Sequence, residues 1–132
     1  MTLILALLLL FFAVAVFWRY ESVQRRFGPM GAAAALFGSV IPAAMLAWVE
    51  FQSFQHLFVL AGVVSNGSAV LCNGGYMPAK GLRRRGVRHR PLTRRSRLRL
   101  LTDVLWGFSV GDILLSVGAI YSLLSWGARV LL

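Results

Sequence analysis

The stretch that decides the fold begins with Asn73-Gly74-Gly75-Tyr76-Met77-Pro78 and ends with Phe108-Ser109-Val110-Gly111-Asp112. Long apolar segments flank it, three before and one after, at about residues 1–18, 29–49, 54–72 and 109–131. A helix of about 20 apolar residues crosses the hydrocarbon core of a bilayer. The sequence therefore predicts an all-α membrane protein: a single domain over residues 1–132, with four transmembrane helices and a basic loop over about residues 73–107.

Composition supports this fold class and argues against several functions. Of the residues, 58% are hydrophobic and 14% charged, whereas a soluble domain carries about 25% charged residues. The first segment lacks the charged start and cleavage site of a signal peptide, so we expect a retained helix. Cys72 is the only cysteine, which excludes an intramolecular disulfide and a thiolate metal cluster. His56 and His89 fall on opposite predicted sides of the membrane, so we expect no metal, no cofactor and no enzymatic activity.

The motif residues at the two ends of the stretch are explained by how helices end and begin. Asn73-Gly74-Gly75 should end the third helix, because glycine adopts the left-handed conformation of a C-cap, and Pro78 prevents the helix from resuming. Ser109-x-x-Asp112 resembles a capping box, in which both side chains bond free N–H groups at the start of the fourth helix.

Small and polar residues inside the apolar segments predict where helices approach one another. Two stripes of small residues recur at helical spacing, in the second and fourth segments: Gly31, Ala35, Ser39 and Ala43, then Gly111, Gly118 and Ser125. In lipid such stripes let backbones come close, and we favour general intramembrane packing over a specific dimer face. Asn66 lies near the middle of the third segment, where an amide is costly unless a neighbouring helix pairs with it.

The loop before the fourth segment carries ten basic residues between Lys80 and Arg99 and no acidic residue among them. The arginines expected to dock on lipid or a partner are Arg83, Arg84, Arg85, Arg88, Arg90, Arg94, Arg95, Arg97 and Arg99. Apolar residues at about 98–106, with Asp103 among them, favour a short helix in the membrane interface. Because basic loops stay in the cytoplasm, we expect this loop and a short polar turn at about 19–28 inside, and both termini outside.

Three blocks in order resemble a family of small bacterial multi-pass membrane proteins of unknown function. The blocks are an N-G-G-x-M-P motif, the run from Ser96 to Asp103, and an F-S-x-G-D motif that opens the last helix. The resemblance covers roughly residues 57–124. It implies a bacterial inner-membrane location and no particular reaction. The motif residues it singles out are Asn73, Gly74, Gly75, Met77, Pro78, Asp103, Ser109, Gly111 and Asp112.

These patterns leave two functional hypotheses open. The favoured one is a non-enzymatic accessory or scaffold protein whose basic loop docks on anionic lipid headgroups or on an acidic protein partner. Association with another membrane protein or in a homo-oligomer stays open. The alternative is a small transporter or lipid-handling protein with an intramembrane polar site around Asn66, Asn73 and Asp112. Nucleic-acid binding is disfavoured because no aromatic residues alternate with the arginines to stack on bases.

Overall fold

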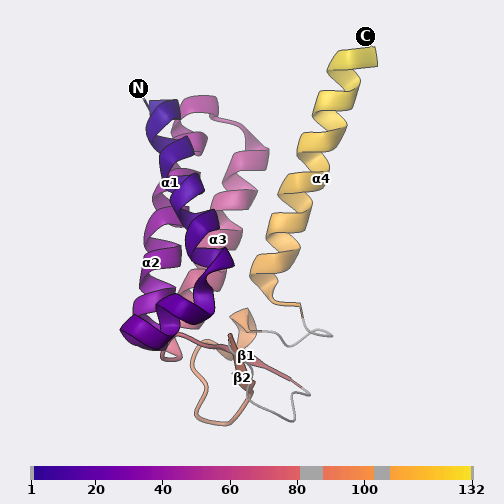
Figure 1. Cartoon of the computed structure of the whole chain (residues 1–132). Helices are drawn as coiled ribbons and strands as arrows, with labels where there is room; N and C mark the ends of the chain where they lie inside the picture. Colours follow the sequence, from indigo (N-terminus) through magenta and orange to yellow (C-terminus); the bar gives the residue numbers. More distant parts are fainter. Residues whose placement is uncertain (1, 81–87, 103–107, 132) are drawn as a thin grey trace.

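The computed structural model describes residues 2–80, 88–102 and 108–131, with side chains as far as residue 128 (Figure 1). The chain is helical, with helices α1 (Thr2–Trp18), α2 (Tyr20–Phe51), α3 (Phe54–Cys72) and α4 (Val110–Leu131). Three of them, α2, α3 and α4 as far as Ala128, are long and apolar enough to cross a membrane, and α1 is a shorter apolar helix. The prediction of a helical membrane protein is therefore confirmed at this level.

Helix α2 begins earlier than the sequence predicted. The polar turn expected at about 19–28 is wrong, because α2 is helical from Tyr20 and the break in its backbone falls at Gly28, with φ 75° and ψ 171°. Its first segment lies across the end of the bundle (Figure 1). Glutamate, glutamine and arginine are good helix formers, so a polar run of this length suits an interfacial helix as well as a turn. Pro29 then opens the long apolar part.

Small residues bring the helices into close contact. Helix α1 packs on α2, and α3 packs on both α2 and α4. A Cβ added to Gly62 of α3 would lie 2.7 Å from the carbonyl oxygen of Gly111 in α4. A Cβ added to Gly118 would lie 2.9 Å from the carbonyl oxygen of Gln55. The stripe on α4 therefore packs inside the chain, as the general packing interpretation predicted.

The segment between α3 and α4 contains a small parallel sheet that the sequence did not reveal. Strand β1 (Met77–Ala79) pairs with strand β2 (His89–Pro91), with Met77 opposite His89. A single 3₁₀ turn, η1 (Arg99–Leu101), follows a left-handed residue, Leu98, with φ 48°. The interfacial helix expected at about 98–106 is therefore absent from its described part, and residues 103–107 lie outside the described residues.

Both termini lie at one end of the bundle, and the sheet and η1 lie at the other (Figure 1). The described part of the basic segment is thus held at the same end as the polar start of α2, which carries Arg25 and Arg26. Most of the described lysines and arginines therefore gather at one end of the molecule.

Candidate functional site

Asn66, Ser109 and Asp112 form a polar cluster between α3 and α4. The Ser109 backbone N–H donates to Asp112 Oδ2 at 2.9 Å, and the Asp112 N–H donates to Ser109 Oγ at 3.0 Å. This reciprocal pair is the capping box that the sequence predicted. Asn66 Nδ2 donates to Asp112 Oδ1 at 2.9 Å, and Ser109 Oγ donates to Asn66 Oδ1 at 2.6 Å.

Every polar side-chain atom of the cluster has a hydrogen-bond partner, and this limits what the cluster can do chemically. Both carboxylate oxygens of Asp112 accept a hydrogen bond, and Asn66 uses its oxygen and its nitrogen. Ser109 is fully buried. An asparagine inside a membrane helix needs a hydrogen-bond partner on a neighbouring helix, and Asn66 has one. The contacts of Asn66, Ser109 and Asp112 are therefore explained by a structural role.

Asn73 belongs to a different cluster. Its Nδ2 donates to the carbonyls of Ala69 at 2.7 Å and Arg97 at 2.9 Å, and its Oδ1 accepts the Arg97 N–H at 2.8 Å. The side chain thus ties the basic loop to the end of α3. Asn73 contacts neither Asn66 nor Asp112 by a hydrogen bond in the described residues, although all three were grouped in the alternative hypothesis.

The two glycines after Asn73 turn the chain as predicted. Gly74 has φ 73° and Gly75 has φ 85°. The Gly75 N–H bonds the Val70 carbonyl at 2.9 Å and the Gly74 N–H bonds the Leu71 carbonyl at 3.3 Å. This is the hydrogen-bond pattern of a Schellman motif, which satisfies the free carbonyls at the end of α3. Met77 and Pro78 are buried in β1, so the motif residues position the loop rather than face solvent.

Aromatic rings hold two of the loop arginines. The Arg88 guanidinium lies 3.9 Å from the ring centroid of Phe17, and the Arg90 guanidinium lies 3.6 Å from that of Tyr76. Arg88 also donates to the Phe17 carbonyl at 3.4 Å. Stacking on a ring fixes the plane of a guanidinium and leaves its N–H edge available.

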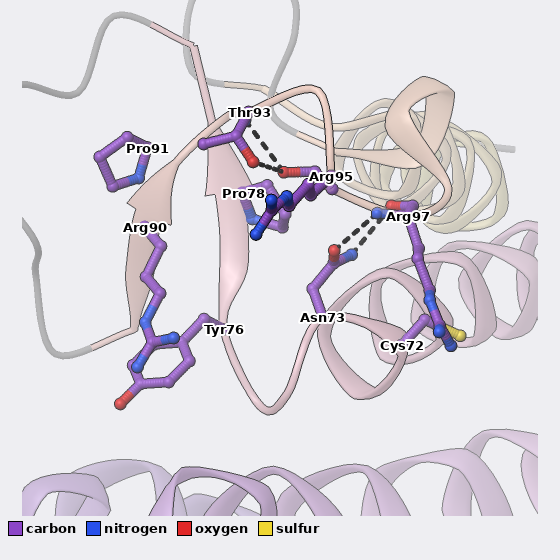
Figure 2. Close-up of a pocket in the computed structure, with 10 residues that line it drawn as sticks. Cys72, Asn73, Tyr76, Pro78, Arg90, Pro91, Thr93, Arg95 and Arg97 are labelled. Carbon is purple, nitrogen blue, oxygen red and sulfur yellow. Dashed lines mark hydrogen bonds between the residues drawn. The ribbon is translucent and has the colours of Figure 1, made fainter.

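A pocket of about 420 Å³ opens beside these residues at the loop end of α3. Figure 2 shows Arg90 and Tyr76 on one side of it, Arg97 and Cys72 on the other, and Arg95 between them. The full lining is Cys72, Asn73, Tyr76, Pro78, Arg90, Pro91, Thr93, Arg95, Ser96 and Arg97. Among the described residues, the lining contains three arginines, the hydroxyls of Tyr76, Thr93 and Ser96, and no acidic residue, so the pocket is chemically suited to an anion.

The structure brings together only some of the predicted docking residues. Arg90, Arg95 and Arg97 share the pocket, Arg88 lines a separate cavity of about 220 Å³, and the exposed Arg94 and Arg99 line neither. Arg83, Arg84, Arg85 and Asp103 lie outside the described residues.

Sequence reasoning missed Tyr76, Thr93 and Ser96 as parts of the site. The signals were present but weak. Tyr76 is the variable position of the N-G-G-x-M-P motif, and Thr93 and Ser96 are spaced for a local turn.

Within the described ranges, no group of three or more histidine, cysteine, aspartate or glutamate residues is placed to hold a metal ion. In comparisons with known proteins, no family model matches the chain, and neither a curated protein nor a solved structure matches it.

Proposed function

We propose that this protein is a non-enzymatic accessory or scaffold protein of a bacterial inner membrane, and that its basic cytoplasmic end docks on anionic lipid headgroups. The resemblance to a bacterial membrane family remains a prediction and supplies the location. The observation that carries the proposal is a cluster of arginines beside exposed leucines at one end of the helical bundle, where the described residues give these arginines no acidic partner.

The arginines are available for a partner outside the chain. Among the residues that the structure describes, no ion pair joins a loop arginine to an acidic side chain. The chain has four acidic residues in all. Of these, Glu50 bonds Thr2 Oγ1 at the opposite end, and Asp112 is engaged in the capping box. Each basic residue near an anionic leaflet contributes about 1 kcal/mol of attraction, so several unpaired arginines supply enough to hold the loop at the surface.

Exposed apolar side chains lie beside these charges. Leu98 is 44% exposed and Leu100 is 85% exposed, on either side of the exposed Arg99. A leucine of this exposure next to an arginine suits the headgroup region, where the leucine enters the acyl boundary and the guanidinium meets phosphate. The combination favours lipid over a purely acidic protein partner.

The placement of charge supports the orientation included in the proposal. Arg25, Arg26 and the loop arginines share one end, and both termini share the other. With α1 spanning a thin hydrocarbon core, the chain crosses the membrane four times, and the positive end stays in the cytoplasm.

The test uses a fluorophore that reports on the polarity of its surroundings. In a Cys72→Ser background, Leu100→Cys carries the label and the full-length protein is placed in nanodiscs of neutral or anionic lipid. We expect a blue shift only with anionic lipid. Raising the salt from about 0.1 M to about 1 M shortens the Debye length from about 10 Å to about 3 Å and should reverse the shift.

A label at Thr2→Cys is the matched control, because Thr2 is exposed at the opposite end of the bundle. It should not respond to lipid charge. The same Leu100 emission in neutral and anionic nanodiscs at low salt would rule out electrostatic docking.

The alternative, a transporter or lipid-handling site around Asn66, Asn73 and Asp112, is supported less well. Asn73 is committed to Arg97, and the polar atoms of the other two side chains are already paired. Asp112 does line the cavity of about 220 Å³ together with Arg88, which is the one feature that favours this alternative.

A further inference from the structure

The pocket at the end of α3 is an open hollow lined by parts of three segments. Cys72 and Asn73 come from the end of α3, Tyr76 and Pro78 from the chain leading through β1, and the remaining residues from β2 and the turn after it. Its volume of about 420 Å³ falls within the range of about 300–1,000 Å³ typical of small-molecule sites. It therefore has room for a phosphate group and the short polar group attached to it.

The charge in the pocket is uncompensated. Arg90, Arg95 and Arg97 line it, no acidic residue does, and the side chains of Arg95 and Arg97 have no hydrogen-bond or ion-pair partner in the described residues. A planar guanidinium presents a fork of N–H donors that matches the oxygens of a phosphate. Three forks, together with the hydroxyls of Thr93 and Ser96, provide more donors than a planar carboxylate can accept.

One of the three guanidinium groups is held in place before any ligand binds, and so is the backbone that carries another. The Tyr76 ring supports Arg90 at 3.6 Å, and Tyr76 Oη in turn accepts a hydrogen bond from Gln24 Nε2 at 3.2 Å. The two hydrogen bonds between Asn73 and the Arg97 backbone fix the far wall. A donor that is already ordered loses less entropy on binding, so Arg90 is the best prepared of the three arginines to bind a specific ligand.

A local turn places the hydroxyls between the arginines. The Thr93 N–H donates to Ser96 Oγ at 3.0 Å, and the Ser96 N–H donates to the Thr93 carbonyl at 3.1 Å. Figure 2 shows this turn at the rim of the pocket, above Arg95. The turn carries Arg95 itself, so its geometry decides where that side chain enters.

We propose that this pocket is a binding site for a phosphate monoester, the dianionic group that ends a phosphatidic-acid headgroup or a small sugar or glycerol phosphate. A monoester offers three free oxygens and up to two negative charges, whereas a diester offers two oxygens and one charge. Three arginines therefore favour the monoester. The proposal rests on the proposed function in one respect, namely that the pocket opens where a membrane-spanning helix ends and so lies at headgroup depth.

Cys72 provides a native reporter, because it is exposed and lines the pocket and is the only cysteine. The full-length protein in neutral detergent is treated with an uncharged maleimide, with or without a water-soluble probe. The probes are dihexanoyl phosphatidic acid, dihexanoyl phosphatidylglycerol, glycerol 3-phosphate and inorganic phosphate. We expect the monoester probes to slow alkylation at concentrations at which phosphatidylglycerol does not.

The choice of probes distinguishes a lipid phosphate from a soluble one. Protection by phosphatidic acid alone assigns the site to a lipid headgroup, and equal protection by glycerol 3-phosphate assigns it to a soluble phosphate. Both results support a phosphate site. Equal protection by phosphatidylglycerol and phosphatidic acid, or protection by none of the probes, overturns the proposal.

Variants that conserve the net charge test whether phosphate binding depends on the pocket or only on the positive charge of the loop. Arg95→Lys with Arg97→Lys keeps the net charge but removes the guanidinium forks, and should weaken binding about tenfold, measured by thermophoresis. Arg94→Lys with Arg99→Lys is the matched control, since neither residue lines the pocket. It should change the dissociation constant less than about twofold.

If both lysine pairs weaken phosphate binding equally, or if neither pair weakens it, the proposed phosphate site is wrong. The outcome can be separated from that of the docking test, because both lysine pairs retain the charge on which docking depends. If the pocket shows no specific phosphate binding but the emission of the label at position 100 still shifts with anionic lipid, the proposed function stands. If the emission of the label does not shift in the protein with all its arginines, the docking function is wrong, whatever the result with the lysine variants.

Discussion

The hydrogen bonds of the cluster between α3 and α4 predict how substitutions of Asp112 change the free energy of unfolding. Asp112→Leu removes the acceptors for the Asn66 amide and the Ser109 N–H, each bonded at 2.9 Å. Leaving a buried donor unpaired costs about 1–3 kcal/mol, so the loss of both acceptors should lower the free energy of unfolding by about 2–6 kcal/mol. Asp112→Asn retains one acceptor oxygen but turns an amide nitrogen toward the other donor, and should cost about 1–2 kcal/mol.

A double-mutant cycle isolates the contact between the helices. Asn66→Leu alone leaves one oxygen of Asp112 and the hydroxyl of Ser109 without their partner. In the double leucine variant the orphaned groups of Asn66 and Asp112 are both gone, so its cost should fall short of the sum of the single costs. We expect an interaction energy of about 0.5–1.5 kcal/mol, the size measured for hydrogen bonds between helices in membranes.

The measurement is SDS titration of the protein in mild detergent, followed by circular dichroism. Leucine should be worse than asparagine at position 112, and any loss of the Leu100 lipid response should follow the loss of stability. Additive effects of the two leucine substitutions would refute the hydrogen bond between Asn66 and Asp112. An Asp112→Asn variant that is as stable as the wild type but no longer responds to lipid would refute the structural role and favour the alternative function.

Two further predictions test packing and orientation. Gly111→Ala should cost about 1–3 kcal/mol, because its Cβ would overlap Asn66 Oδ1 and lie 2.6 Å from the Gly62 carbonyl oxygen. Gly127→Ala, with no atom within 4 Å of the added Cβ, should leave the SDS midpoint equal or slightly higher. Ser96→Cys in a Cys72→Ser background should resist an impermeant maleimide added outside intact cells and react after the membrane is opened; labelling from outside would reverse the proposed topology.

The helices and their ends could be predicted from the sequence because their causes are local. The predicted third helix, 54–72, is α3, and Gly74 and Gly75 have the left-handed backbone expected of a helix stop. Ser109 and Asp112 lie three residues apart, so their reciprocal bonds depend only on helix geometry. Where local causes conflict, prediction failed. The polar start of α2 combines helix-forming residues with a turn-like composition, and the structure makes it helical as far as Gly28.

Only the tertiary structure decided which polar residues meet. Asn66 and Asn73 are seven positions apart, a spacing that puts two residues on one face of a helix. Nevertheless, Asn66 pairs with a residue 46 positions away and Asn73 with one 24 positions away. These pairings depend on the close crossing of α3 and α4 at Gly62 and Gly111 and on the path of the loop through β1 and β2.

The pocket follows from the same nonlocal contacts. The run of arginines was plain in the sequence, but which of them share a cavity with Tyr76 was not. The reason is physical: a side chain's face is set by the local backbone, whereas its partner is set by the packing of segments distant in the chain.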